Sequence, residues 1–265
     1  MVIENLQLGK IEKDPSQEWG FGEFQKRVDS IYKEHDIKCD YGPDTMLAKL
    51  IGNVVTLTHA LRKTPNEVET ISRSLTNVFV WTSTIANLAD IDIQEIMKEK
   101  FGEGCPHCKQ MPCFLAEGKK CKKPAELILK INQIAVPTSL DNWQEHLKKM
   151  YSNNYNGDLI QSMRFCSTKV SEEAEELIGS AYADIDRELK GVSFDSILAS
   201  SFKSEMADLI AWSMAVANCL DAKNGKYSIE LSLKEKYKDG CPYCKSPKCI
   251  CKKEKTFIEE LKNNS

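Results

Sequence analysis

Two short groups of carboxylates in the C-terminal half have the spacing of side chains that share one helix face. Glu173 and Glu176 are three residues apart, and Glu172 and Glu176 are four apart. Glu205 and Asp208 are again three apart. If two antiparallel helices carry them, both groups can meet, and they would repel each other strongly unless a cation lay between them. Oxygen ligands suit Mg²⁺ or Mn²⁺, which keep coordination positions open for substrate phosphates.

Eight of the 11 cysteines lie in two clusters, which is typical of metal binding rather than of a disulfide scaffold. Four thiolates form a common closed zinc site, so we expect two structural Zn²⁺ sites. The fourth ligand of each site stays open, with His107 an alternative in the first cluster. An iron–sulfur centre and a redox Cys-x-x-Cys are further alternatives. The clusters are Cys105, Cys108, Cys113 and Cys121, then Cys241, Cys244, Cys249 and Cys251.

The three other thiols, Cys39, Cys166 and Cys219, stand alone, and we expect them to be small buried side chains. Lysines crowd both clusters, where they can neutralise the charge of a zinc–thiolate centre. A small anion-binding or nucleic-acid patch is the alternative interpretation, but aromatic residues that could stack on bases are scarce there.

The cysteine clusters end two similar segments, which indicates an internal repeat. The first Cys-Pro-x-Cys matches the second at an offset of 136 residues, and Trp81 matches Trp212 at an offset of 131. We predict two homologous halves over 19–125 and 141–265, after an N-terminal extension over 1–18 and separated by a linker over 126–140.

The repeat bears on the carboxylates, for which a solvated acidic helix face is the alternative interpretation. Glu175 fits that alternative. The first half keeps the tryptophan and the cysteines but lacks the whole carboxylate set, which favours a metal site in the second half. The equivalent positions in the first half are Gly52, Asn53, Thr56, Ser74 and Asn77.

Both halves show apolar residues at helical spacing and little strand-like alternation. We expect one long helix from about Val170 to Leu189, with Ser171 and the glutamates in its N-terminal region. The other expected helices cover 21–35, 44–62, 67–88, 93–101, 126–134, 141–151, 202–220 and 229–238. The expected fold is an all-α bundle made of two similar units.

Composition limits the possible partners and compartments. The 265 residues include 36 basic and 39 acidic side chains, for a formal charge of −3, so no bulk positive field favours nucleic acid. No apolar run is long enough to span a membrane, and the N-terminus lacks the apolar core of a signal peptide. We therefore expect a cytoplasmic protein without a membrane or nucleic-acid partner.

The carboxylate pattern resembles a known family. Glu172-Glu173-Ala174-Glu175-Glu176, a gap of 28 residues and Glu205-Met206-Ala207-Asp208 resemble the E-E-x-x-E … E-x-x-D signature of the MazG-like all-α nucleoside triphosphate pyrophosphohydrolases. The runs Ala207-Asp208-Leu209-Ile210, Ala217-Asn218 and Glu235-Lys236-Tyr237 are similar to neighbouring family motifs. The first half resembles a degenerate copy of the same unit, and the cysteine-rich tails are additions that the signature does not require.

The resemblance implies hydrolysis of a nucleoside triphosphate, NTP or dNTP, to the monophosphate and pyrophosphate. It implies that Glu173, Glu176, Glu205 and Asp208 hold Mg²⁺. It also implies that Glu172 helps to bind a second ion or orients the attacking water. Family members commonly form dimers, so the two halves are expected to form a pseudo-dimer within one chain, and a further homo-oligomer stays open.

Other residues are candidates for substrate binding. Lys169, Lys190 and Lys236 can meet phosphates, Trp212 can flank a base, and Asn218 belongs to a family motif. A structural role is the alternative for most of them, because the first half carries Lys49, Lys100, Trp81 and Asn87 at the equivalent positions.

Two other functions are alternatives to hydrolysis. One is a non-enzymatic zinc protein that binds nucleotides or a partner, and a turnover assay separates it from an enzyme. The other is a di-iron carboxylate enzyme, which would need histidines at Glu-x-x-His spacing on the carboxylate helices, and the chain has none there.

Overall fold

The computed structural model describes residues 18–113, 121, 135–152, 158–188 and 201–252, and every regular element within them is a helix. This confirms the all-α fold expected from the sequence. The first half contains α1 (Phe21–Lys38), α2 (Pro43–Lys63), α3 (Val68–Leu88) and α4 (Ile93–Phe101). The second half repeats this order with α5 (Leu140–Met150), α6 (Leu159–Glu188), α7 (Ser201–Asn224) and α8 (Ile229–Tyr237).

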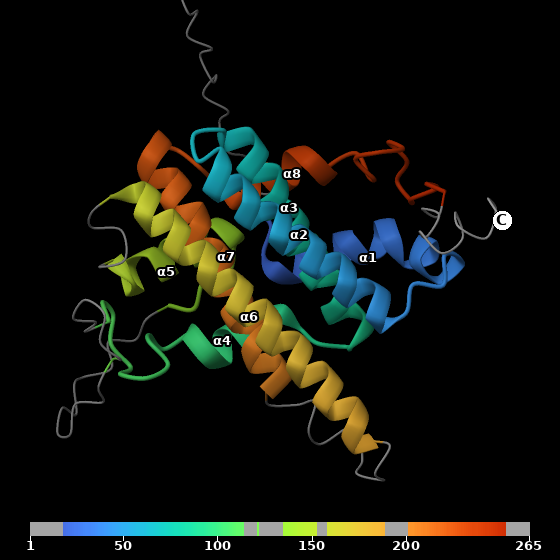
Figure 1. Ribbon diagram of the computed structural model, residues 1–265, viewed down its shortest axis with the longest axis horizontal. Coiled ribbons are helices and arrows are strands. Elements are labelled where there is room, and N and C mark those ends of the chain that lie inside the picture. Colours follow the sequence, from blue (N-terminus) through green and yellow to red (C-terminus); the bar gives the residue numbers. More distant parts are fainter. Residues whose placement is uncertain (1–17, 114–120, 122–134, 153–157, 189–200, 253–265) are drawn as a thin grey trace, which may run out of the picture.

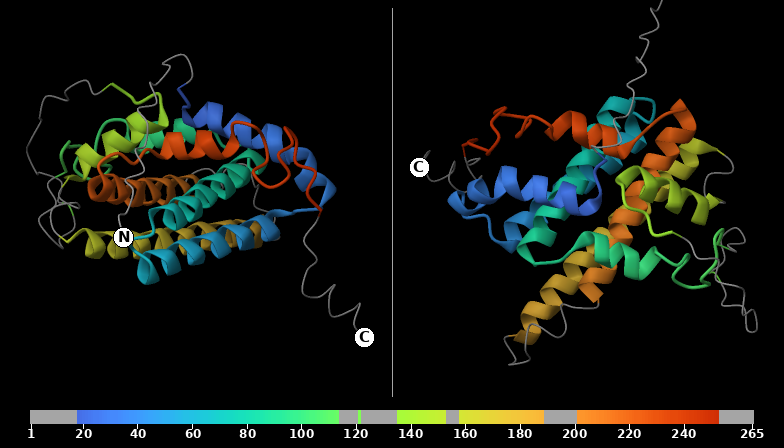
Figure 2. Two further views of the ribbon diagram at one scale, coloured as in Figure 1. Left: turned by 90° about the horizontal axis from the view of Figure 1, so that it is seen from above. Right: turned by 180° about the vertical axis from the view of Figure 1, so that it is seen from behind.

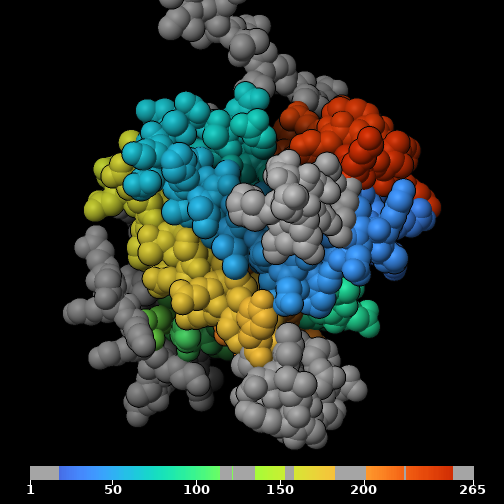
Figure 3. All heavy atoms as spheres, turned by 45° about the vertical axis from the view of Figure 1, so that its right-hand side comes forward, coloured from blue at the N-terminus to red at the C-terminus, as the bar shows by residue number. Residues whose placement is uncertain are grey.

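The helices are stacked in three layers (Figure 1, Figure 2). The long helices α2 and α6 lie side by side in one outer layer, and they form adjoining strips of the surface (Figure 3). Helices α3 and α7 form the middle layer, and the shorter helices α1, α4, α5 and α8 cover its other side. Because α7 is covered from both sides, it buries residues around most of its circumference, from Met206 to Leu220.

The last helix of each half packs against the other half. Helix α4 contacts α7, and α8 contacts α3. The carbonyl oxygen of Phe101, at the end of α4, lies 2.8 Å from Nε2 of His146 in α5. The equivalent carbonyl of Tyr237, at the end of α8, accepts hydrogen bonds from Arg27 in α1, the shorter of them 2.9 Å long. The two halves therefore interleave, and each one supplies a helix to its neighbour.

A second pair of equivalent contacts explains the two asparagines that the halves share. Asn87 donates through Nδ2 to the Gln25 carbonyl at 3.1 Å, and Asn218 donates to the Gln144 carbonyl at 3.2 Å. Each glutamine also accepts, through Oε1, the first backbone N–H of the last helix in its half. These amides join three helices in each half, which is a structural role.

Helix α6 differs from the expectation. It begins at Leu159 rather than near Val170, so the prediction that Ser171 lies in its N-terminal region was wrong. The Ser171 hydroxyl instead donates to the Ser167 carbonyl at 3.1 Å, a contact that a serine can make inside a helix. The buried side chains of Met163 and Cys166 precede Val170 at helical spacing and extend its apolar face towards Leu159. Leu189, Lys190 and the expected helix over 126–134 lie outside the described residues.

The short helices begin at side chains that cap their first backbone N–H groups. Asp92 accepts the N–H of Glu95 before α4, at 3.2 Å. Ser139 and Ser228 act in the same way before α5 and α8. Such caps fix where α4 and α8 enter the other half. None of the described helices combines the length and the apolarity that a membrane crossing requires.

Candidate functional site

Three carboxylates meet where α6 packs along α7. Glu173 and Glu176 on α6 and Glu205 on α7 each place one oxygen atom within 4.8 Å of the others. Oxygens around one Mg²⁺ lie about 3–4 Å apart, because each Mg–O distance is about 2.1 Å. The structure therefore brings together three of the four expected Mg²⁺ ligands at a separation close to that of a shared cation.

Asp208, the fourth expected ligand, lies one turn beyond Glu205 on α7 and pairs with a lysine from the first half. Lys100, at the end of α4, forms an ion pair with Asp208. The same ammonium group donates to the backbone carbonyl of Ser204 at 2.9 Å and to its hydroxyl at 2.6 Å. Because α4 crosses onto α7, the carboxylate site contains side chains from both halves.

Burial and mutual repulsion disfavour the charged forms of Glu173, Glu205 and Asp208 in the absence of a cation. Desolvation raises the pKa of Glu173 to about 7, and the charges of Asp208, Glu176 and Glu205 act in the same direction. Desolvation also raises the pKa values of Glu205 and Asp208, although Lys100 partly opposes this. Such a set of oxygen donors fits a divalent cation, which would stabilise all the charged forms together.

Glu172 lies at the rim of the cluster rather than in it. Its side chain is 47% exposed and forms an ion pair with Lys169, one turn earlier on α6. The charges of Glu172, Glu173 and Glu176 all raise the pKa of Lys169, after its hydrogen bond to Glu172. Lys169 is therefore a cation at the edge of the carboxylates, as a phosphate partner would be.

The other substrate candidates contact protein groups outside the carboxylate cluster. Lys236 donates to Thr76 at 2.9 Å and to Asn77 at 2.6 Å, both on α3. Asn218 is fully buried in the Gln144 contact described above. Trp212 is half-buried and meets Phe165 edge to face, with ring centroids 5.7 Å apart.

Lys100 is the residue that the sequence argument missed at this site. Its equivalent in the second half, Lys236, lies in the run that resembles a family motif, and the sequence predicted Lys236 at the site in its place. Because α4 packs on α7 and α8 packs on α3, Lys100 reaches the carboxylates and Lys236 reaches the first half. A signal existed in the sequence, because Lys100 and Lys236 occupy the same position in the repeat.

The first cysteine cluster brings its four thiols together. The Sγ atoms of Cys105, Cys108, Cys113 and Cys121 all lie within 4.8 Å of one another, and those of Cys108 and Cys113 are 3.7 Å apart. Sulfurs around a tetrahedral zinc are about 3.8 Å apart, because each Zn–S distance is about 2.3 Å. The cluster can hold a metal ion with Cys121 as the fourth ligand, and His107 is not part of the group.

The second cluster has the same geometry. Cys241, Cys244, Cys249 and Cys251 lie within 4.8 Å of one another, with 3.8 Å between the sulfurs of Cys241 and Cys251. It too can hold a metal ion. The tight Cys-x-Cys spacing at its end therefore does not prevent four sulfurs from converging. The lone thiols Cys39, Cys166 and Cys219 are buried, as expected.

The turn between the paired cysteines is the same in both clusters. The N–H of Cys105 donates to the Gln110 carbonyl at 3.2 Å, and the N–H of Cys241 donates to the Ser246 carbonyl at 2.9 Å. The residue before each turn is a glycine with positive φ. A Cβ on Gly240 would lie 2.2 Å from the Ser246 carbonyl oxygen, so only glycine fits there.

Each cysteine cluster, together with its turn, forms a knuckle that packs against the first helix of the other half. The N–H of Cys113 donates to the Met150 carbonyl at the end of α5, at 2.7 Å. The N–H of Cys249 donates to the Ile31 carbonyl in α1, also at 2.7 Å. His107 of the first knuckle lies close enough to Asp208 for its charge to lower the pKa of that carboxyl. A metal in either knuckle would thus stabilise a contact between the halves.

Comparisons of the chain with models of known protein families, with curated proteins and with solved structures find no match.

Proposed function

We propose that the chain is a Mg²⁺-dependent nucleoside triphosphate pyrophosphohydrolase of the MazG-like type. The observation that carries the proposal is the convergence of Glu173, Glu176 and Glu205, with Asp208 beside them. The equivalent positions of the first half carry no carboxylate. A cluster that is complete in one half and absent from the other is typical of a site rather than of a solvated surface.

In this proposal Glu173, Glu176, Glu205 and Asp208 hold the metal. Bound Mg²⁺ would neutralise the phosphate oxygens and the charge that develops on them. Lys100, Lys169 and His107 are the neighbouring basic groups that can contact the remaining phosphate oxygens. Asp208 then exchanges part of its contact with Lys100 for the metal.

The proposed reaction is attack of water on the α-phosphorus. The bond between that phosphorus and the oxygen bridging to the β-phosphate breaks, and the electron pair leaves with pyrophosphate. One proton of the water passes to a base or to solvent. Glu172 is the candidate that orients the water, which requires it to release Lys169 to the incoming phosphates.

We further propose that the two halves form an intramolecular pseudo-dimer with one hydrolytic site, and that both cysteine clusters hold structural Zn²⁺. The equivalent contacts of His146 and Arg27 support the first point, since they relate the halves residue by residue. The sulfur separations of both clusters support the second.

The test is pyrophosphate release from a panel of NTPs and dNTPs with Mg²⁺ or Mn²⁺. Glu176→Gln removes one ligand charge, and we expect turnover to fall by about 100-fold or more. Glu175→Gln is the matched control, because Glu175 is an exposed neighbour outside the cluster. Turnover that is equal in both variants, or absent from the wild type with every nucleotide, would refute the proposal. The second result would favour a non-enzymatic, nucleotide- or partner-binding protein.

A further inference from the structure

The first half contains a cavity where the repeat places the counterpart of the carboxylate site. Its volume is about 490 Å³, and it lies between α1, α2, α3, the end of α8 and the second cysteine knuckle. Pockets for small ligands commonly measure about 300–1,000 Å³. Its lining residues Lys49, Asn53, Asn77 and Trp81 correspond in the repeat to Lys169, Glu173, Asp208 and Trp212.

The contacts of Lys236 beside this cavity repeat those of Lys100 at the carboxylate site, except that an amide takes the place of a carboxylate. Lys100 contacts the Ser204 carbonyl and pairs with Asp208. Lys236 contacts the carbonyl of Arg73, which corresponds to Ser204 in the repeat, and Asn77, which corresponds to Asp208. The amide replaces the carboxylate, so the lysine keeps its place and loses its counter-ion.

The half-buried Lys236 therefore carries a positive charge that no neighbouring acid neutralises. Its hydrogen-bond acceptors among the described residues are the Arg73 carbonyl, the Thr76 hydroxyl and the Asn77 amide oxygen, none of which is charged. Desolvation, with the charge of Arg73 in second place, lowers the pKa of Lys236 to about 8. An anion that approached Asn77 would offset this cost.

The other charged groups of the lining are two cations, one carboxylate and the second cysteine cluster. Lys49 and Lys252 are the cations, and the carboxylate is Asp36. Asp36 is buried and lies 3.1 Å from Nδ1 of His35, and desolvation raises its pKa. A metal–thiolate centre at the cysteines that line the cavity would offset part of the positive charge. The cations near Asn77 favour an anionic ligand at that place, and no divalent cation is needed to hold it.

Aromatic side chains line the same cavity and can hold a planar ring. Trp81 on α3 is half-buried, and Tyr243 of the knuckle is 79% exposed. Tyr32, Tyr41 and Tyr237 also line the cavity. Aromatic rings of this kind stack on nucleobases whatever the base. Cations and stacking rings in one cavity are the two elements of a nucleotide site.

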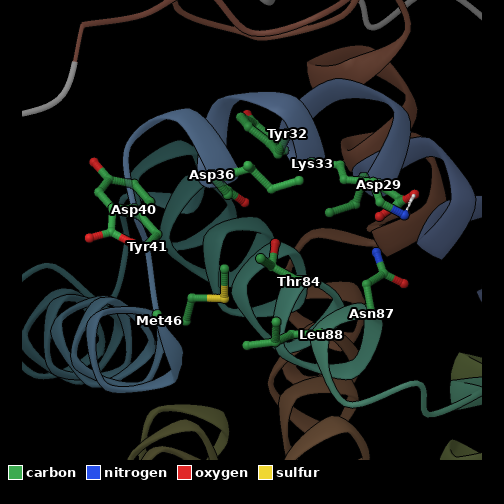
Figure 4. A pocket seen from close by; sticks show the side chains of 13 residues that line it. Asp29, Tyr32, Lys33, Asp36, Asp40, Tyr41, Met46, Thr84, Asn87 and Leu88 are labelled. Atoms are coloured by element: carbon green, nitrogen blue, oxygen red, sulfur yellow. Dashed lines mark hydrogen bonds and ion pairs between the residues drawn. The ribbon is translucent and has the colours of Figure 1, made fainter.

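A second hollow adjoins the first and enlarges the space for a ligand. It measures about 420 Å³ and lies between α1, the start of α2 and the end of α3 (Figure 4). Tyr32, Asp36, Tyr41 and Thr84 line both hollows, so the two share a wall. Figure 4 shows the apolar side chains of Met46 and Leu88 on the side of this hollow opposite Tyr32.

We propose that this cavity is a second nucleotide site, which binds a nucleoside 5′-phosphate without a divalent cation and does not hydrolyse it. The phosphate lies near Lys49, Lys236 and Asn77, and the base stacks among the aromatic rings. The proposal takes from the proposed function only the choice of a nucleotide as ligand. It gives the first half a binding role in addition to its packing against the second half.

The test is calorimetric titration of the full chain carrying Glu176→Gln, in magnesium-free buffer without chelator, so that bound zinc is retained. The probes are a nucleoside triphosphate, the monophosphate, the unphosphorylated nucleoside and pyrophosphate. We expect both nucleotides to bind, and the nucleoside to bind at least about tenfold more weakly, because it lacks the charge that Lys236 needs. Pyrophosphate alone should bind weakly, because it cannot stack.

Asn77→Asp is the decisive variant, since it gives Lys236 the counter-ion that Asp208 gives Lys100. We expect the dissociation constant of the nucleotides to rise at least about tenfold. Asp208→Asn, the reverse change at the equivalent position, should leave this binding within about twofold. Lys236→Met is a second variant that should also abolish binding, in case Asn77→Asp does not fold.

The outcomes separate this inference from the proposed function. Metal-free nucleotide binding that Asn77→Asp weakens supports the second site, even if the wild type hydrolyses no nucleotide. Hydrolysis without any metal-free binding overturns the second site and leaves the hydrolase standing. Metal-free binding that Asp208→Asn strengthens and Asn77→Asp leaves unchanged would place the nucleotide at the carboxylates and would also overturn the inference.

Discussion

Lys100 and Asp208 come from different halves of the chain and form an ion pair at the edge of the carboxylate cluster. The equivalent lysine, Lys236, makes the equivalent contact with Asn77. At this contact an amide in the first half takes the place of a carboxylate in the second. Lys100 therefore neutralises an acid, and Lys236 is a cation that lacks a charged partner among the described residues.

Removal of the Lys100 charge should destabilise the metal-free protein. Asp208 is 26% exposed, and without Lys100 it would face Glu173 and Glu176 with only the weaker charge of His107 to oppose them. We expect Lys100→Met to lower the free energy of unfolding by about 2 kcal/mol in magnesium-free buffer. Saturating Mg²⁺ should recover much of this loss. Denaturant unfolding with and without Mg²⁺ measures both values, and a loss that Mg²⁺ leaves unchanged would argue against a cation at this site.

Lys236 should make stability depend on pH in the opposite sense to a lysine whose pKa is raised by an ion pair. Its pKa is lowered to about 8 in the folded chain and is about 10.4 in an unfolded chain. The folded state therefore binds this proton less tightly, so its cost is complete below about pH 8 and disappears as the pH rises towards 10.4. Relative to Lys236→Met, the wild type should gain stability between pH 8 and pH 10.

Paired denaturation curves at the two pH values isolate this group, because all other groups titrate alike in both proteins. Lys100→Met supplies the comparison, since Lys100 has a carboxylate partner. A difference between wild type and Lys236→Met that stays constant with pH would show that the lysine is not desolvated as the structure indicates.

Metal analysis should separate the two cysteine clusters. Protein purified without chelator should contain one zinc ion per cluster, and Cys241→Ser with Cys244→Ser should remove one of the two. The loss should also release the contact between Cys249 and Ile31 and open the adjoining cavity. Amide hydrogen exchange in α1 should therefore rise. Cys219→Ala, at a lone buried thiol, is the control that should keep both ions.

The sequence was sufficient for the parts of the site that depend on short spacings. Carboxylates three residues apart on a helix must share a face, so Glu173 and Glu176 could be placed together without a structure. The cysteine knuckles are also local, because a Cys-x-x-Cys turn fixes two ligands by itself. Their later cysteines were harder to place, and the structure assigns Cys121 and Cys251 to the clusters.

Side-chain contacts between the two halves could not be predicted from sequence spacing. Lys100 and Asp208 are 108 residues apart, and only the crossing of α4 onto α7 brings them together. The equivalent crossing of α8 onto α3 brings Lys236 to Thr76 and Asn77. Glu172 shares a helix face with Glu176 by spacing, yet its contact with Lys169 holds it at the rim. Spacing defines a face of about 100°, and tertiary contacts decide which side chains on that face meet.

Substitution of Asn218, an asparagine that both halves share, tests whether its role is catalytic or structural. It is fully buried and donates to the Gln144 carbonyl, as Asn87 does to Gln25 in the half without carboxylates. We expect Asn218→Ala to lower the free energy of unfolding by about 2 kcal/mol, because it leaves the Gln144 carbonyl without its donor in a buried place. Asn87→Ala should lower it by about 1 kcal/mol, because Asn87 is only half-buried and water can reach the Gln25 carbonyl in its place.

Kinetics at a temperature where both variants are folded complete the comparison. If the role is structural, Asn218→Ala and Asn87→Ala change kcat/KM of the proposed hydrolysis alike. A substrate contact would appear as a rise in KM for Asn218→Ala that Asn87→Ala does not share. Because the two asparagines make the same hydrogen bond in the two halves, the pair serves as its own control for loss of stability.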